Sequence, residues 1–257
     1  MFPIPNASHD LTGRVALVTG AGGALGRRFA QVLASCGASV AVADIRLDTL
    51  DATADSITDA GGTCHASFLD LTEPASIPTF VDDIESSLGQ IDILVNNAGT
   101  NDPGRPQKVP FDVVNTVVCT NLSGPFALTR EVGRRLIESE TPGNIVNISS
   151  IAAYVYTTRS ASAMYSITKA AVARMTETLA VEWARYNINV NAIAPGIFHS
   201  DMTQGMIDRM GDLSDQQPRK RLGVPPQLDS TLLFLVSRAS ECVTGTIIKV
   251  DDGQKSR

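Results

Sequence analysis

A tyrosine and a lysine four residues apart are the side chains of this sequence best placed to do proton chemistry. Tyr165 and Lys169 share one face if their segment is helical, because residues i and i+4 lie one above the other. A tyrosine with an unperturbed pKa of about 10 is a poor base at neutral pH. Lowering that pKa by about 3 units takes roughly 4 kcal/mol, which a neighbouring ammonium supplies at an effective dielectric constant near 20. The pair is therefore suited to general acid–base catalysis.

A glycine-rich turn near the start of the chain is suited to binding a pyrophosphate. It runs from Thr19 to Gly26, directly after the apolar run Val15–Val18 and before a stretch with helical periodicity. Glycines permit the tight turn and let the pyrophosphate approach the backbone and the helix N-terminus. A position between a strand and a helix is the context that a dinucleotide site requires. The residues of the turn expected to contact a dinucleotide are Gly20, Gly23, Leu25 and Gly26.

An acidic residue after the second apolar run indicates which dinucleotide is bound. Asp44 lies about 20 residues beyond the glycine turn, where a carboxylate can accept hydrogen bonds from the adenosine ribose hydroxyls. The same carboxylate would repel a 2′-phosphate, since a unit like-charge pair 4 Å apart costs roughly 4 kcal/mol at an effective dielectric constant of 20. NAD is therefore expected in preference to NADP. Arg46 could in principle reach a 2′-phosphate, but we interpret it as a surface residue of the following helix.

Short apolar runs alternate with longer helical patterns along the chain. The expected strands are Val15–Val18, Ser39–Ala43, Thr63–Phe68, Ile91–Val95, Asn144–Ile148, Asn189–Ala194 and Gly245–Val250. The expected helices are Ala24–Ser35, Leu47–Ala60, Ala75–Leu88, Phe111–Ile137 in one or two pieces, Ala163–Tyr186 and Gln227–Val236. This alternation predicts a doubly wound α/β fold, a Rossmann-type parallel sheet with helices on both faces. No linker or repeat interrupts it, so we expect one domain over residues 1–257.

Composition excludes several other classes of protein. The formal net charge is -6 and the basic residues are scattered, which disfavours nucleic-acid binding. No apolar stretch approaches the length of about 20 residues that a membrane helix needs. The four cysteines and three histidines lack metal-ligand spacing, so no metal is expected and the thiols are expected to be reduced, in the cytoplasm.

Taken in order, the motifs resemble those of the short-chain dehydrogenase/reductase family over nearly the whole chain. They are Thr19–Gly26, Asn96-Asn97-Ala98-Gly99, Asn121, Ser149-Ser150, Tyr165 with Lys169, Pro195-Gly196, and Thr244-Gly245 before Val250-Asp251. The resemblance implies hydride transfer between NAD and a small secondary alcohol or ketone. It also implies a homo-oligomer, a tetramer or dimer, with its interface on the helices around Asn121 and Tyr165.

The resemblance assigns roles to four side chains. Tyr165 would exchange the proton with the substrate oxygen, and Lys169 would hold the nicotinamide ribose and lower the tyrosine pKa. Ser150, chosen over Ser149 because the family's serine is usually the second of such a pair, would polarise the substrate oxygen. Asn121 would support a water-linked proton relay.

The remaining cofactor contacts follow from position within the family pattern. Asp70 and Leu71 are expected at the adenine, Asn97, Ala98 and Gly99 on the adenosine-ribose side, Pro195, Gly196 and Ile197 at the nicotinamide carboxamide, and Ser200 in place of the usual threonine. Two residues depart from the pattern. Ala24 replaces the middle glycine of the turn, and Asp252 stands where a glycine is usual after Asp251.

The substrate is left open. Its surroundings are expected to include the polar loop 101–105, Met164, Tyr154 and Tyr156 (which could equally pack at a subunit interface), and a lid over residues 197–215. The runner-up activity is a 3-oxoacyl-thioester (acyl-carrier-protein) reductase using NADPH, disfavoured by Asp44 and by the absence of a basic residue at Gly23. A catalytically silent dinucleotide-binding protein is disfavoured because all four catalytic residue types are present.

Overall fold

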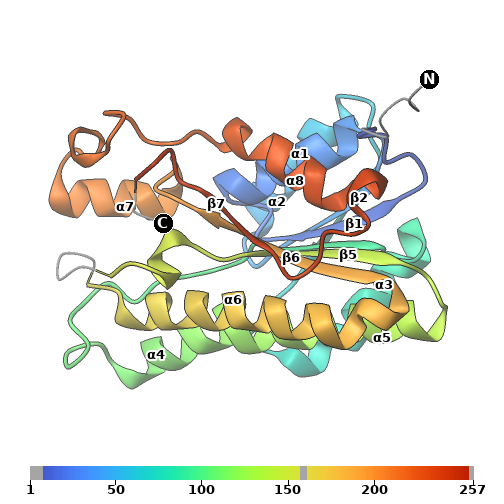
Figure 1. Ribbon diagram of the computed structural model, residues 1–257, viewed down its shortest axis with the longest axis horizontal. Helices are drawn as coiled ribbons and strands as arrows, with labels where there is room; N and C mark the ends of the chain where they lie inside the picture. Colours follow the sequence, from blue (N-terminus) through green and yellow to red (C-terminus); the bar gives the residue numbers. More distant parts are fainter. Residues whose placement is uncertain (1–7, 157–160, 255–257) are drawn as a thin grey trace.

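The computed structural model describes residues 8–156 and 161–254, which form a parallel sheet covered by helices on both faces (Figure 1). The strands are β1 Val15–Thr19, β2 Ser39–Asp44, β3 Cys64–Phe68, β4 Ile93–Asn96, β5 Gly143–Ile148, β6 Ile188–Pro195 and β7 Ile247–Val250. Their order is β3-β2-β1-β4-β5-β6-β7 and every pairing is parallel. The predicted doubly wound α/β fold is therefore confirmed.

The helices divide between the two faces of the sheet. They are α1 Ala24–Ser35, α2 Leu47–Thr58, α3 Ile77–Leu88, α4 Phe111–Val118, α5 Gly124–Glu138, α6 Ala163–Trp183, α7 Asp201–Met210 and α8 Asp229–Val236. Figure 1 shows α1, α2 and α8 on one face and α4, α5 and α6 on the other. The strand order reverses between β1 and β4, which leaves a crevice at the carboxyl ends of these strands.

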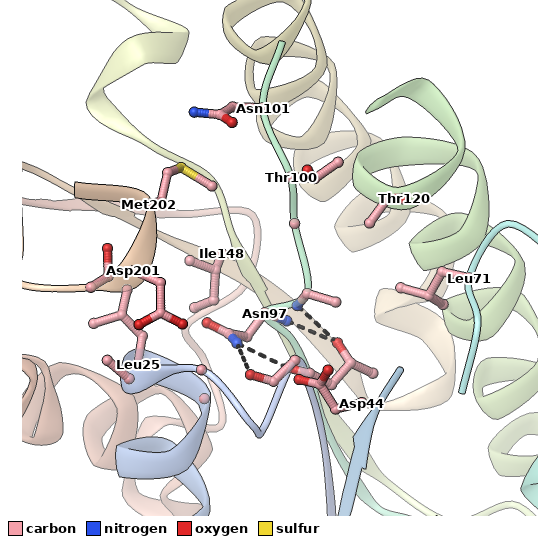
Figure 2. A pocket seen from close by; sticks show the side chains of 18 of the residues that line it. Leu25, Asp44, Leu71, Asn97, Thr100, Asn101, Thr120, Ile148, Asp201 and Met202 are labelled. Atoms are coloured by element: carbon pink, nitrogen blue, oxygen red, sulfur yellow. Dashed lines mark hydrogen bonds between the residues drawn. The ribbon is translucent and has the colours of Figure 1, made fainter. Parts of the chain in front are cut away.

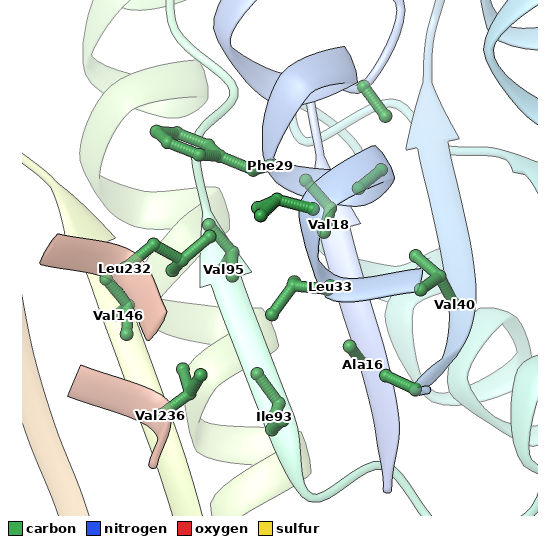
Figure 3. Close-up of a cluster of buried hydrophobic side chains, with 14 of the residues drawn as sticks. Ala16, Val18, Phe29, Leu33, Val40, Ile93, Val95, Val146, Leu232 and Val236 are labelled. Atoms are coloured by element: carbon green, nitrogen blue, oxygen red, sulfur yellow. The ribbon is translucent and has the colours of Figure 1, made fainter. Parts of the chain in front are cut away.

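Two apolar cores lie on opposite faces of the sheet because successive strand residues point in opposite directions. Ala16 and Val18 pack against α1 and α8, where Phe29 and Leu232 are fully buried (Figure 3). The alternate residues of the same strand, including Leu17, belong to the core under α3, α5 and α6. Strands buried on both faces read as continuous apolar runs, which is why the sequence predicted them.

The expected elements differ from the observed ones mainly at their ends and in one helix. The stretch expected as Phe111–Ile137 is α4, a π-helical segment Cys119–Ser123 and α5. Helix α7 was not expected as an element, although Ser200 and Asp201 give it a capping hydroxyl and an acidic first turn. Strand β7 begins at Ile247 rather than at Gly245, whose φ of +74° ends the preceding turn.

Candidate active site

A cavity of about 830 Å³ opens at the carboxyl ends of the strands, where ligands of such sheets bind. Figure 2 shows its walls, formed by the glycine turn and the segments that follow β2, β3, β4, β5 and β6. The predicted site residues that line it are Gly20, Gly23, Leu25, Gly26, Asp44, Asp70, Leu71, Asn97, Ala98, Gly99, Ser150, Tyr165, Lys169, Pro195, Gly196 and Ser200. Two predicted residues, Asn121 and Ile197, are not part of its wall.

The glycine turn packs too closely for side chains at two of its positions. Gly20 has a φ of +65°, and a Cβ there would lie 2.7 Å from the Cα of Ala98. A Cβ on Gly26 would collide with the carbonyl oxygen of Gly20. Ala24, the departure from the family pattern, is the first residue of α1 and has ordinary helical backbone. Its methyl group is therefore accommodated without backbone strain.

Asp44 is buried at the end of β2 and holds the backbone of two turns. One carboxylate oxygen accepts a hydrogen bond from the Gly22 amide at 2.9 Å, and the other accepts from the Arg46 amide at 2.9 Å. The carboxylate also faces the cavity. A carboxylate oxygen accepts more than one hydrogen bond, so Asp44 retains acceptor capacity towards a ribose.

Arg46 is a surface residue at the start of α2, as expected, and it also lines the cavity. It is half-exposed at the N-terminal boundary of α2, but its guanidinium lies 3.7 Å from Asp44 and 3.1 Å from Asp201 of α7. Its Nη2 lies 3.7 Å from the position that a Cβ on Gly23 would occupy. This arrangement could not be predicted, because Asp201 lies 155 positions from Arg46 in the chain.

The segment after β4 is fastened to the glycine turn. The Asn97 side-chain amide donates to the carbonyl oxygens of Thr19 and Gly20, at 2.9 and 3.1 Å (Figure 2). The Thr19 hydroxyl accepts hydrogen bonds from the amides of Asn97 and Ala98, both at 3.1 Å. The Asn97 side chain therefore shapes the turn, and Thr19 is a contributing residue that the sequence reasoning did not single out.

The segment after β3 forms another part of the wall. One oxygen of Asp70 accepts hydrogen bonds from the amide and the hydroxyl of Thr72, at 2.8 and 2.7 Å. Leu71 is buried and presents its side chain to the cavity (Figure 2). Both residues thus lie in the cavity wall, as the family pattern predicts.

Tyr165 and Lys169 lie together on α6, beside the two serines at the end of β5. The Lys169 ammonium is 5.7 Å from the centre of the Tyr165 ring and donates to the carbonyl oxygen of Ile148 at 2.7 Å. The Ser149 hydroxyl donates to the backbone carbonyl of Lys169 at 2.8 Å. The Ser150 hydroxyl accepts from the Ala152 amide and lies close enough to the Tyr165 side chain to influence its pKa. The two serines therefore differ, because the Ser149 hydroxyl is committed to the backbone of α6 whereas Ser150 lies beside the tyrosine side chain.

Burial perturbs the pKa of both α6 side chains. It raises the pKa of Tyr165, and the hydrogen bond with Ser150 opposes that rise. Burial lowers the pKa of Lys169 to about 8. In the protein without a dinucleotide, Lys169 is not among the groups that shift the Tyr165 pKa, and its ammonium bonds to the Ile148 carbonyl. The lowering of the tyrosine pKa by Lys169 together with an oxidised nicotinamide stays a prediction.

Asn121 is buried in the π-helical segment between α4 and α5, a type of irregularity common at functional sites. Its side-chain oxygen accepts from the Thr100 amide, and its side-chain nitrogen donates to the Thr100 carbonyl and the Thr168 hydroxyl. These bonds join the loop after β4 to α6. The side chain thus lies behind the cavity wall, where it fixes the position of Thr100.

A buried carboxylate that was expected near the substrate instead caps the helix that carries Tyr165. Asp102 is 2% exposed, and its two oxygens accept from the backbone amides of Met164 and Tyr165, at 3.0 and 2.8 Å. Ser162, at the N-cap position, makes no side-chain capping bond. The loop after β4 thus supplies the cap that α6 lacks.

The segment after β6 differs from expectation at one residue. The Ile197 amide donates to the side-chain oxygen of Gln254 at 2.7 Å, and the expected cofactor contact at Ile197 stays a prediction. Phe198 lines the cavity in its place. Ser200 is the N-cap of α7, where its hydroxyl accepts from the Thr203 amide.

Asp252, the second departure from the family pattern, has a structural partner. It adopts a φ of +52°, which disfavours most non-glycine residues, and its carboxylate pairs with Arg221 at 2.7 Å and Arg219 at 3.1 Å. These two ion pairs hold the chain after the lid against the C-terminal turn.

The two tyrosines that were candidates for the wall of the substrate pocket lie outside the cavity wall. Tyr154 and Tyr156 are half-exposed, and the Tyr154 ring packs 4.2 Å from the ammonium of Lys249 on β7.

Among residues 8–156 and 161–254, no cluster of three His, Cys, Asp or Glu side chains could hold a metal ion. None of the helices within these ranges combines the length and apolar character needed to cross a bilayer.

Comparisons with known proteins agree with this geometry. A family model described as short chain dehydrogenase matches residues 14–210. The chain is 34% identical to a 3-oxoacyl-[acyl-carrier-protein] reductase of Salmonella typhimurium, over 94% of this chain and 97% of that protein. It is also 34% identical to a 2-dehydro-3-deoxy-D-gluconate 5-dehydrogenase of Dickeya dadantii, over 97% and 98% of the two chains.

A solved structure has the same architecture. It is a gluconate 5-dehydrogenase from Burkholderia cenocepacia in complex with NADP and tartrate, 32% identical, with a TM-score of 0.89 over 96% of this chain and 97% of that one. The family match covers more than half of the chain, and these similarities extend over almost all of it. The chain therefore belongs to the short-chain dehydrogenase/reductase family of oxidoreductases.

Proposed function

We propose that this chain transfers a hydride between NAD(H) and a secondary alcohol or ketone, with Tyr165, Lys169, Ser150 and Asn121 as its catalytic group. The observation that carries the proposal is the contact of Ser150 with Tyr165 in the same cavity that Asp44 faces. A substrate oxygen placed between the two hydroxyls would be polarised by one and exchange its proton with the other.

The residues present fit a dinucleotide. The turn before α1 has no side chain at Gly23, and the first helical turn contains no acidic residue that would compete with a phosphate. The N-terminus of α1 is therefore suited to an anion. We propose that Gly20, Leu25 and Gly26 complete this cradle.

The nicotinamide and adenine would lie on either side of the phosphate cradle. We propose that Asp44 accepts from the adenosine ribose. The other proposed contacts are Asp70, Leu71, Asn97, Ala98 and Gly99 on the adenosine side, and Pro195, Gly196, Phe198 and Ser200 on the nicotinamide side. When bound, the dinucleotide supplies or accepts the hydride.

Near neutral pH Tyr165 is in the form that acts as the acid when a carbonyl is reduced. Burial raises the pKa of its hydroxyl, so the phenol keeps its proton there. A protonated phenol is the form that donates to a carbonyl oxygen. Lys169, whose pKa is lowered to about 8, is largely cationic below that pH and would hold the nicotinamide ribose.

NAD preference rests on Asp44, whose buried carboxylate would repel a 2′-phosphate. The test is a fluorescence titration of the purified protein with NADH and NADPH, followed by turnover assays with secondary alcohols and ketones. Tighter binding of NADH with turnover supports the proposal. Tight binding without turnover on any substrate would support a catalytically silent protein instead.

A second candidate is an NADPH-linked 3-oxoacyl-thioester reductase. It is favoured by the position of Arg46 at the mouth of the cavity and by the similarity to the Salmonella reductase. Tighter binding of NADPH, with reduction of a 3-oxoacyl thioester, would place this candidate first.

We further propose that residues 1–257 act as one domain with residues 197–215 as the lid, and that two or four copies associate through α5 and α6. A shallow apolar hollow between these helices is lined by Leu122, Phe126, Met175 and Leu179, and Phe126 is half-exposed. Light scattering of the purified protein tests the association.

A cytoplasmic location is proposed because the four cysteines, all within the described residues, are unpaired.

A further inference from the structure

One ion pair joins the two sides of the cavity mouth. Arg46, at the start of α2, donates from Nη1 to the carboxylate of Asp201 at 3.1 Å. Asp201 is the first residue of α7, within the lid, and lies 155 positions further along the chain. Both side chains line the cavity that also holds Asp44, and Figure 2 shows Asp201 and Asp44 there.

Arg46 is surrounded by more negative than positive charge. Its guanidinium lies between the carboxylates of Asp44 and Asp201, and Asp48 adds a further attraction. Arg46 and Lys169 are the basic side chains among the described residues that line the cavity, and Lys169 is engaged at Ile148. Arg46 is therefore the cation available to a 2′-phosphate beside Asp44.

We propose that Asp201 is a specificity-determining residue for the dinucleotide, because it engages the guanidinium that a 2′-phosphate would need. The inference rests on the proposed dinucleotide function and adds a residue of the lid to it. NADP must displace Asp201 from Arg46 before it gains a charge-assisted hydrogen bond there. NAD carries no such phosphate and leaves the pair intact.

The strength of the pair limits the size of the effect. Arg46 is 47% exposed and Asp201 is 75% exposed at the side chain. Exposed ion pairs are weak, so their loss changes an equilibrium constant by no more than about fivefold. Asp44 therefore remains the larger determinant, and Asp201 adjusts the preference that Asp44 establishes.

The test measures dissociation constants for NADH and NADPH in four proteins: the parent, Asp201→Asn, Arg46→Ala and the double variant. Asp201→Asn should tighten NADPH binding about threefold to fivefold and change NADH binding by less than about twofold. In the Arg46→Ala background the same substitution should leave the NADPH constant unchanged. The control is Asp208→Asn, which removes a charge from an exposed position of the same helix and should alter neither constant.

The outcomes separate this inference from the proposed function. If the parent binds NADH and Asp201→Asn leaves NADPH binding as it was, the role of Asp201 is refuted and the oxidoreductase proposal stands. An equal gain in the Arg46→Ala background would also refute it, since a general change of charge would then explain the gain. If the parent binds neither dinucleotide, both the proposed function and this inference fail.

Discussion

Replacing each of the two adjacent serines with alanine should damage different properties of the protein. The Ser150 hydroxyl contacts Tyr165 in the cavity, whereas the Ser149 hydroxyl is buried and donates to the Lys169 carbonyl at 2.8 Å. In the proposed mechanism the Ser150 hydroxyl lies where charge develops on the substrate oxygen. The Ser149 bond instead holds the backbone of α6 against the end of β5.

The magnitudes follow from these positions. Removing a hydrogen-bond donor to a developing oxyanion costs about 10²–10³ in kcat, which is the loss expected for Ser150→Ala. Ser149→Ala removes a hydrogen bond to the Lys169 carbonyl, which keeps its helical partner within α6, so the expected cost is about 0.5–1.5 kcal/mol of unfolding free energy. For a chain of this size, each 1 kcal/mol lowers Tm by roughly 2–4 °C. Ser149→Ala should keep kcat within about tenfold of the parent.

Two measurements on the same samples check this prediction. Thermal unfolding should show a lower Tm for Ser149→Ala and a nearly unchanged Tm for Ser150→Ala, while steady-state kinetics should show the reverse order of damage. A large loss of kcat in Ser149→Ala, with Ser150→Ala close to the parent, would refute the reasoning and transfer the catalytic role to the first serine.

Three further predictions concern pH, the choice of dinucleotide and the glycine turn. Reductive kcat/KM should be flat below about pH 8 and fall above it, which a pH–rate profile checks. The pKa of Lys169 is lowered to about 8, so above that pH the side chain loses the positive charge proposed to hold the nicotinamide ribose. Asp44→Ala should relax the discrimination against NADP in binding titrations, and an unchanged ratio would assign the preference elsewhere. Gly26→Ala should abolish dinucleotide binding and lower Tm, since the new Cβ collides with the backbone of Gly20. Normal binding would show that the turn can widen enough to accept a methyl group.

The glycine turn and the strands could be predicted because their signals are local. β1 is buried on both faces, so it appears as an unbroken apolar run, and the turn must be small where Gly20 passes Ala98. The spacing of Tyr165 and Lys169 is likewise a local consequence of the helix that carries them.

The features that could not be predicted depend on distant parts of the chain. The pairing of Arg46 with Asp201 joins residues 155 positions apart, and the cap that Asp102 gives to α6 crosses 63 positions. Ile197 matches the family pattern, but Gln254 from the C-terminal turn takes its amide. No sequence pattern reports such contacts.

The direction of the Tyr165 pKa shift was also beyond the sequence. Spacing places a lysine nearby, but the shift depends on how far each side chain is removed from water. In the folded protein burial raises the pKa of Tyr165 and lowers the pKa of Lys169 itself.

The most direct test of the central claim is Tyr165→Phe, which removes one hydroxyl and keeps the ring. NADH binding by fluorescence titration and turnover by absorbance of the reduced nicotinamide should be measured on the same preparation. Turnover should be lost while the NADH dissociation constant stays within about threefold of the parent value. Turnover within about tenfold of the parent would contradict the assignment of Tyr165 as the group that exchanges the proton.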